Sequence, residues 1–342
     1  MLKISASYIQ QIEAATTPAD LYPLLQNAIE LEHSTIPPYL SALFSLKPQT
    51  NVQERNIIHS IVVEEMMHMT IAANILNALG GQPQINNSNF VPNYPGPLPM
   101  GIGEALIVGL EKYSPDLVKN VFMEIEEPES PLHLKFALTA EAVDYKTIGQ
   151  FYIALQKKIE KLPGDTLPGD PTKQVSFDTL FPILTKQDAI NAINIIVEQG
   201  EGTNTSPLDQ QKEVAHYYRF EELYRGRKLI EDPSAPHGFS FTGDVIPFDA
   251  NNVFPIFPNT KTTMLAEGTE ERRRMDDFNA SYFSLLNGLQ RTFNNDPGYL
   301  SDAIGVMYDL KLIAEKLCAT PFPGKEGYTL GPSFEFVNKN SL

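Results

Sequence analysis

The sequence has only one cysteine, Cys318, among its 342 residues. A single cysteine can form neither an intrachain disulfide nor a zinc–thiolate site, so a disulfide framework and a zinc-ribbon scaffold are excluded. The chain has no run of about 18 apolar residues, and residues 1–8 contain no long apolar stretch of the secretory type. We therefore expect a cytoplasmic protein that does not cross a membrane.

Basic residues are also scarce. The chain has 26 Lys and Arg against 42 Asp and Glu, which gives a net charge of −16. Nucleic-acid binders and proteins that bind anionic membranes need basic surfaces, so this charge argues against both classes. No glycine-rich phosphate loop and no nucleophile elbow is present. The sequence offers instead many carboxylates, which are hard metal ligands, in a chain long enough for a large core.

A first long helix is predicted to begin at Thr17-Pro18-Ala19-Asp20, which combines an N-cap, a first-turn proline and an acid. Pro37-Pro38 should kink this helix and free carbonyl groups one turn earlier, and Lys47-Pro48 should end it. Glu32 lies within its apolar stripe, and Tyr39 follows two turns later on the same face. This pair suits a metal ligand with a phenol beside it. The alternative is that Glu32 is a solvent-exposed helix residue with no such role.

A second helix is predicted over residues 52–78 and closed by Gly80-Gly81. Its apolar stripe contains both Glu65 and His68, which are three residues apart and therefore share one helix face. An unpaired buried charge costs on the order of several kcal/mol, and a bound metal cation is one group that would compensate it. The alternative is a hydrogen-bonded core pair without metal.

Further helices are expected near residues 115–127, 147–162, 185–201, 209–224, 267–294 and 300–320. Loops rich in Asn, Pro and Gly separate several of them, and the sequence has no convincing series of strands and no internal repeat. The expected fold class is therefore all-α with long loops. Residues 15–231 would form a helical bundle. Residues 232–342 would add a Pro-rich connection and two C-terminal helices packed on that bundle.

The spacing Glu-x-x-His occurs twice, at Glu65/His68 and at Glu213/His216. In an acidic chain such a match arises easily by chance, so the spacing alone is weak. The apolar stripe around Glu65 and the preceding helix with its own apolar-face carboxylate strengthen the first pair.

Several segments resemble the ferritin-like superfamily. They are residues 31–40 (LEHSTIPPYL), residues 65–68 (EMMH) with 77–81 (NALGG), and residues 198–202 (EQGEG) with 216–220 (HYYRF). More narrowly, they resemble the ferritin-like domain of the iminophenyl-pyruvate dimer synthases of the violacein and rebeccamycin type. The resemblance covers roughly residues 20–230, with a weaker similarity near 303–321. It implies a four-helix bundle that holds metal in its core.

Such a bundle takes further ligands from its third and fourth helices. His216 is the expected imidazole of the fourth helix, although a core histidine in an aromatic helix would look the same. Its carboxylate partner would be Glu201, a preference that rests partly on the EQGEG segment. Glu213, in the regular Glu-x-x-His spacing, and Glu198 are the alternatives.

The third-helix position departs from the family pattern, because Gln150 stands about where a Glu is expected. Thr147 and Gln150 also fit a capping box, which needs no metal. Glu126 is another candidate, although it equally suits a solvated acid near a helix end. A missing carboxylate would lower the charge of the site and leave one metal position weak or empty.

Tyr39 is therefore expected beside a metal site made of Glu32, Glu65, His68, Glu201 and His216. Mixed carboxylate and imidazole ligands suit one or two ions of iron, or manganese, with zinc as a further occupant. The expected function is a metal-dependent oxidoreductase for a small organic substrate, which the resemblance implies to be aromatic or amino-acid-derived and part of secondary metabolism. The alternatives are an iron-handling ferroxidase and a non-catalytic accessory protein with a degenerate site. The oligomeric state, a homodimer included, stays open.

Overall fold

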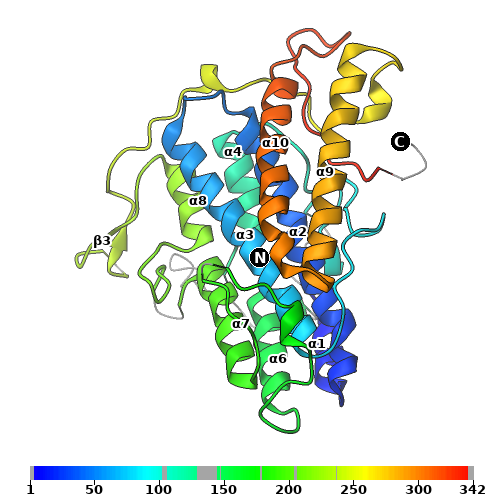
Figure 1. Ribbon diagram of the computed structural model, residues 1–342. Helices are drawn as coiled ribbons and strands as arrows, with labels where there is room; N and C mark the ends of the chain where they lie inside the picture. Colours follow the sequence, from blue (N-terminus) through cyan, green and yellow to red (C-terminus); the bar gives the residue numbers. More distant parts are fainter. Residues whose placement is uncertain are drawn as a thin grey trace.

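The structure is a computed structural model that describes residues 4–101, 106–128, 145–146, 148–177, 179–203, 206–235 and 237–337. These residues are mainly helical, which confirms the predicted all-α class (Figure 1). The α-helices are α1 (Ala6–Ala14), α2 (Tyr22–Ser45), α3 (Val52–Ala78), α4 (Pro115–Leu117), α5 (Met123–Ile125), α6 (Ile148–Glu160), α7 (Lys186–Glu201), α8 (His216–Arg225), α9 (Glu270–Asn294) and α10 (Leu300–Cys318). Two short antiparallel ladders pair β1 (Ile4–Ser5) with β2 (Tyr145–Lys146) and β3 (Ile230–Glu231) with β4 (Phe239–Ser240).

The two longest helices of the bundle, α2 and α3, pack along each other in its centre. The predicted start at Thr17 is confirmed, because Thr17 and Asp20 form a capping box over a short 3-10 turn that leads directly into α2. The predicted range of α3 is also confirmed. Gly80 follows its end with a φ of +93°, a conformation that only glycine adopts without strain.

The two consecutive prolines do not end α2, which continues through Pro37 and Pro38 as far as Ser45. Pro38 has no amide hydrogen for the carbonyl group of Ser34, four residues earlier. This carbonyl accepts a hydrogen bond of 2.7 Å from the hydroxyl of Tyr94 instead. A side chain from a distant loop therefore satisfies the carbonyl that the sequence predicted to be free.

The third and fourth positions of the bundle are each divided between two shorter segments. The first half of the third bundle helix is one continuous segment made of α4, a π turn (Val118–Phe122) and α5. Its second half is α6. α7 and α8 divide the fourth position in the same way. In Figure 1, α4 and α8 lie in the upper half of the molecule, and α6 and α7 lie in the lower half. Helix ends therefore meet near mid-height beside α3, which contacts both α7 and α8.

The helix predicted from about residue 209 begins only at His216. Residues 207–215 form a turn instead, in which Leu208 and Val214 make an isolated β-bridge. The carboxylate of Asp209 accepts the amide of Glu213 at 2.8 Å and stabilises this turn. Local side-chain to backbone bonding of this kind competes with a helix and explains why the periodic pattern failed here.

The C-terminal helices α9 and α10 pack against each other and against the bundle, with contacts from α10 to α2 and from α9 to α3. The side chain of Asn77 in α3 donates a hydrogen bond of 2.7 Å to the carbonyl of Phe293 in α9. A single apolar core extends from Ile4 to Phe334. Among the described helices, none combines the length and the apolar composition needed to span a membrane.

Candidate metal centre

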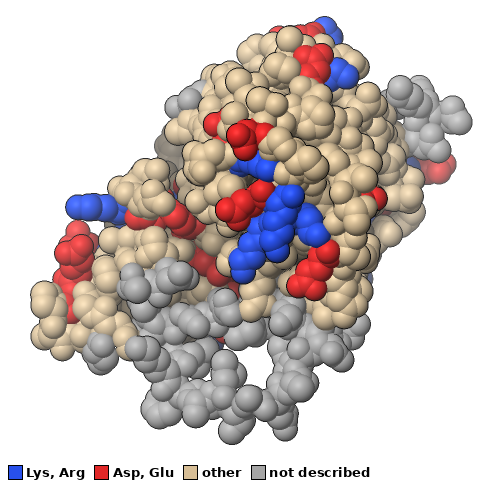
Figure 2. Space-filling model, turned by 90° about the horizontal axis from the view of Figure 1, so that it is seen from below, with Lys and Arg blue, Asp and Glu red and all other residues tan. Residues whose placement is uncertain are grey.

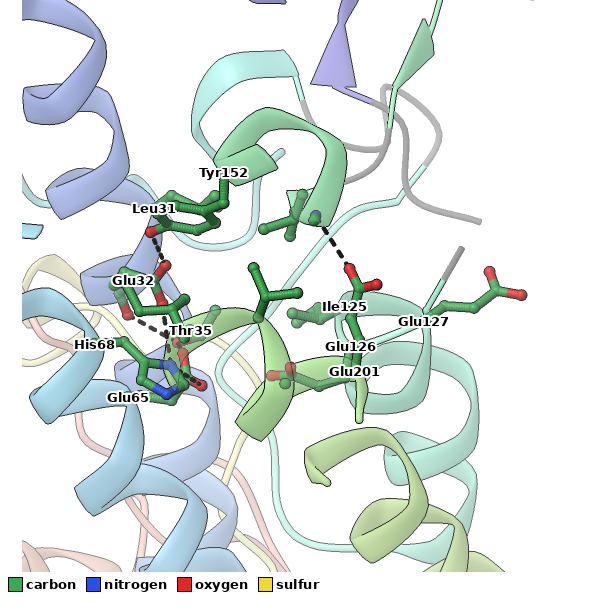
Figure 3. Close-up of a pocket in the computed structure, with 15 residues that line it drawn as sticks. Leu31, Glu32, Thr35, Glu65, His68, Ile125, Glu126, Glu127, Tyr152 and Glu201 are labelled. Carbon is green, nitrogen blue, oxygen red and sulfur yellow. Dashed lines mark hydrogen bonds and ion pairs between the residues drawn. The ribbon is translucent and has the colours of Figure 1, made fainter. Parts of the chain in front are cut away.

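Five acidic and imidazole side chains meet where the helix ends of the bundle come together. α2 provides Glu32, and α3 provides Glu65 and His68. Glu126 is the residue that ends α5, and His216 is the first residue of α8. Figure 3 shows Glu32, Glu65 and His68 turned toward one another. All of these side chains are largely buried, and His216 is fully so.

Both imidazole rings turn their Nδ1 atoms toward the carboxylates. His216 Nδ1 lies 2.9 Å from Glu65 Oε1 and 3.5 Å from Glu126 Oε2. His68 Nδ1 lies 3.6 Å from the same Glu65 Oε1 and 3.7 Å from Glu32 Oε2. The two rings are stacked, with centroids 5.3 Å apart. Glu65 therefore stands between the two imidazoles, and one donor atom each from Glu65, His68 and His216 lies within 4.8 Å of the others.

Each of the three carboxylates has its second oxygen atom next to a hydroxyl group. Tyr39 donates a hydrogen bond of 2.6 Å to Glu126 Oε1, and Tyr152 donates one to Glu32 Oε1. The hydroxyl of Thr35, which also contacts the carbonyl of Glu32, lies 2.7 Å from Glu65 Oε2. One oxygen of every carboxylate is thus fixed by a hydroxyl, while the other faces the imidazoles.

The Nε2 atoms of the two imidazoles point away from the carboxylate group and have their own partners. His68 Nε2 donates to the side-chain oxygen of Gln199 in α7 at 2.9 Å. His216 Nε2 donates to Glu64 Oε2 in α3 at 2.8 Å. Histidines that bind metal commonly have their other ring nitrogen held by a carbonyl or carboxylate, which fixes the orientation of the ring.

The protonation equilibria show that this group of residues attracts positive charge. Burial raises the pKa of Glu32. Burial also disfavours ionised Glu65, but its close contacts with the two imidazoles outweigh burial and lower its pKa. Burial disfavours charged His68, yet Glu32 and Glu65 raise its pKa to about 10. The surrounding carboxylates likewise raise the pKa of His216 well above its usual value. The carboxylates therefore hold either protons on the imidazoles or a cation in their place.

A cavity of about 50 Å³ adjoins the group. This volume admits one or a few molecules the size of water. Charged and polar side chains line it together with an apolar wall, which is formed by Leu31, Ile125, Ile148, Ile196 and Val197.

Glu201, the expected carboxylate partner of His216, lines this cavity, but its carboxylate is turned to another partner. Glu201 Oε1 accepts a hydrogen bond of 3.0 Å from the backbone amide of Gly149 at the start of α6. Glu126, a second-choice candidate in the sequence, is the carboxylate that lies beside His216 Nδ1 instead. Figure 3 shows both side chains on the same side of the cavity.

The other three candidates lie away from the imidazoles. Gln150 lines a separate groove between α1 and α6, and Thr147, its expected capping partner, is outside the described residues. Glu213 is exposed in the turn before α8, so the expected helical pairing of Glu213 with His216 is wrong. Glu198 accepts a hydrogen bond of 2.6 Å from Gln210.

Sequence reasoning missed four residues that contact the group, namely Thr35, Glu64, Tyr152 and Gln199. Thr35 offered a signal, because it lies in α2 one turn before Tyr39, within the LEHSTIPPYL segment. Glu64 offered none, since it lies one residue away from the apolar stripe that contains Glu65 and His68. Tyr152 and Gln199 depend on how α6 and α7 are placed, which the helical periodicity of their own segments does not specify.

Comparison with known proteins identifies the family. A family model described as Ferritin-like matches residues 25–225. Dichlorochromopyrrolate synthase of Lentzea aerocolonigenes is 23% identical over an alignment 397 positions long, which covers 98% of this chain. The chain spans only 38% of the length of that relative. A solved structure of a ferritin-like protein from Caulobacter vibrioides matches with a TM-score of 0.61 and 23% identity, covering 93% of this chain and 97% of that one, and supports the fold. The chain belongs to the ferritin-like family.

Proposed function

We propose that this chain is a metal-dependent oxidoreductase whose ligands are Glu32, Glu65, Glu126, His68 and His216. The observation that carries the proposal is the orientation of the three carboxylates. Each has one oxygen next to a hydroxyl and turns the other toward an imidazole Nδ1 atom. Glu32 faces His68, Glu126 faces His216, and Glu65 faces both rings. Ferritin-like bundles hold metal with ligand sets of this type.

The donor atoms fit a metal ion in one further respect. His216 Nδ1 is buried and lies 2.9 Å from Glu65 Oε1, but the direction of this contact is not that of a hydrogen bond. A metal cation held between this nitrogen and the carboxylates would replace the ion pair and satisfy the Nδ1 lone pair. Mixed carboxylate and imidazole donors suit one or two ions of iron or manganese, and they also accept zinc. Bound iron or manganese would supply redox chemistry toward dioxygen or a peroxide.

The residues around these ligands would protect such chemistry. Burial raises the pKa of Tyr39 and of Tyr152 well above the usual value, so both phenols stay protonated and keep donating to Glu126 and Glu32. Tyr39 is fully buried against Phe122 and Phe220, at ring distances of 4.6 and 5.1 Å. This apolar packing excludes water from one side of the ligands.

A substrate class is supported by the similarity to dichlorochromopyrrolate synthase. We propose a small organic substrate, aromatic or amino-acid-derived. The cavity of about 50 Å³ has room for a dioxygen-sized reactant. Organic ligands of larger size usually occupy pockets of about 300 Å³ or more, so such a substrate would react from the mouth of the cavity.

The small cavity also favours a second candidate, an iron-handling ferroxidase, because that activity needs no space for an organic molecule. The two candidates differ in iron capacity. Saturation at one or two irons per chain supports the oxidoreductase, whereas continued uptake with mineral formation supports iron handling.

Metal content tests the proposal. The purified protein is stripped with a chelator, reconstituted with ferrous iron or manganese, and measured by elemental analysis. The wild-type chain should retain one or two ions, and Glu65→Ala and His68→Ala should lose most of them. Glu213→Ala is the matched control, because Glu213 is exposed and away from the imidazoles. A wild-type chain that binds no metal, or a Glu65→Ala variant that binds as much as wild type, would overturn the assignment.

A further inference from the structure

The two imidazoles of the metal centre differ in what holds their outer nitrogen. The partner of His68 Nε2 is the neutral side-chain amide of Gln199, at 2.9 Å. The partner of His216 Nε2 is the carboxylate of Glu64, at 2.8 Å. The rings are otherwise comparable, since both are buried and both turn Nδ1 toward the same oxygen of Glu65.

Glu64 is itself held in place by an arginine from the same helix as His216. Arg219 donates from its two terminal nitrogens to the two carboxylate oxygens of Glu64, and the bond to Oε1 measures 2.9 Å. The same arginine donates to the hydroxyl of Ser60, one turn before Glu64 in α3, at 3.0 Å. The side chains of Arg219 and Glu64 are only 12% and 14% exposed. A two-point contact of this kind fixes the carboxylate plane and keeps Glu64 from turning toward the metal ligands.

We propose that Glu64 is the positioning residue of His216, and that it makes His216 a stronger metal donor than His68. This inference rests on the proposed metal-binding function. A carboxylate that accepts the Nε2 hydrogen increases the electron density at Nδ1 more than a neutral amide does. The first metal ion is therefore held mainly through His216, and Gln199 leaves His68 as the weaker of the two imidazole ligands.

Metal affinity measures this role directly, without any assay of activity. The metal-free protein is titrated with zinc or cobalt at constant pH, and the dissociation constant of the first ion is compared between variants. Glu64→Gln keeps the size of the side chain and removes its charge. It should raise the dissociation constant of the first ion about 10- to 100-fold, which is the usual effect of losing a hydrogen-bond partner of a metal-binding histidine.

Glu222→Gln provides the matched control. Glu222 is a buried carboxylate in α8, the helix that also contains Arg219. It accepts hydrogen bonds from Lys228 at 2.7 Å and from the amide of Leu229 at 2.8 Å. Its replacement makes the same charge change at the other end of the helix, away from the imidazoles. This variant should lower the unfolding temperature but leave the dissociation constant of the metal unchanged.

The reciprocal variant, Gln199→Glu, separates tuning of the metal from a general structural effect. It places a carboxylate behind His68 and should tighten metal binding by about tenfold, opposite in sign to Glu64→Gln. Loss of a merely structural contact cannot produce opposite signs in the two variants. In the cobalt-loaded protein, the visible absorption bands of both variants should also shift relative to wild type.

Equal affinity in Glu64→Gln and wild type would overturn the role of Glu64 and leave the metal site intact. An equal loss of affinity in Glu64→Gln and Glu222→Gln would overturn it as well, because the effect would then be one of stability. Failure of the wild-type chain to bind zinc or cobalt is a different result, and it would overturn both this inference and the proposed function.

Discussion

The hydroxyl groups of Tyr39, Tyr152 and Thr35 give the candidate centre its orientation. A carboxylate can turn about its terminal bond, and a donor on one oxygen limits that freedom. In this chain Tyr39 reaches across to Glu126, and Tyr152 reaches across to Glu32. The carboxylate of each candidate ligand is thus oriented by a hydroxyl from another helix. The packing of the bundle therefore determines where the second oxygen of each carboxylate points.

Replacing the phenol of Tyr152 tests this dependence. Tyr152→Phe removes the hydroxyl donor from Glu32, which is 5% exposed. Because hydrogen bonds to charged groups contribute about 1.5–3 kcal/mol, the metal-free variant should lose about that much free energy of unfolding in urea. Tyr113→Phe is the control, because the buried Tyr113 hydroxyl has no partner among the described residues. That control should change stability by less than about 0.5 kcal/mol, and equal losses in both variants would contradict the role of Tyr152.

Most of the candidate ligands that the sequence predicted and that meet in the structure lie on helices that carry the signal themselves. Glu32, Glu65 and His68 interrupt apolar stripes of helices that the chain forms as predicted. His216 was also predicted, and it joins the group although its helix starts later than expected. The exchange of Glu201 for Glu126 beside His216 was beyond prediction, because it depends on where α5 ends and where α6 begins. The amide of Gly149, in the first turn of α6, donates a hydrogen bond to Glu201. Glu126 is the carboxylate that lies beside His216.

At the scale of secondary-structure elements, uninterrupted helices were easier to predict than divided ones. α3 has its predicted bounds because its apolar stripe is continuous and a glycine pair follows it. The fourth position of the bundle was predicted as a helix from about residue 209, yet the turn before His216 breaks it. This break puts His216 in the first turn of α8, next to α3, where its ring reaches Glu65.

The start of α2 gives a pH-dependent prediction. Backbone hydrogen bonds from Thr16 and Thr17 lower the pKa of Asp20 to about 2. A lowered pKa in the folded state means that the contribution to stability is present above about pH 4 and is lost as the pH falls toward 2. Asp20→Asn should therefore unfold at a lower temperature than wild type at pH 5, and the difference should shrink by pH 2.5. A difference in unfolding temperature that is constant over this range would contradict the assignment.

The charge of the whole molecule is not spread evenly. The face seen in Figure 2 carries a cluster of basic side chains with acidic ones beside it, within a largely uncharged surface, although the net charge is −16. Several of the acidic residues, Glu32 and Glu65 among them, are buried at the candidate metal centre and do not contribute to this surface. Composition alone predicted many available carboxylates, but only the fold shows which of them lie beside the imidazoles.

The boundary predicted at residues 231 and 232 has a consequence for the unfolding of the whole chain. Phe293 in α9 is fully buried and its carbonyl accepts a hydrogen bond from α3, so the C-terminal helices and the bundle share one core. Elements that share a core are expected to unfold in one cooperative transition. Phe293→Ala should therefore destabilise α2, α3, α9 and α10 together, by about 3–5 kcal/mol.

Hydrogen–deuterium exchange with peptide resolution measures this effect in each helix separately. Tyr308→Ala in α10 is the matched control, because Tyr308 is 68% exposed and its loss should change stability by less than about 0.5 kcal/mol. Faster exchange in α9 and α10 alone, with α2 and α3 as protected as in wild type, would show that residues 232–342 unfold independently. Equal acceleration in all four helices would instead mean that the C-terminal helices unfold together with the bundle that holds the candidate ligands.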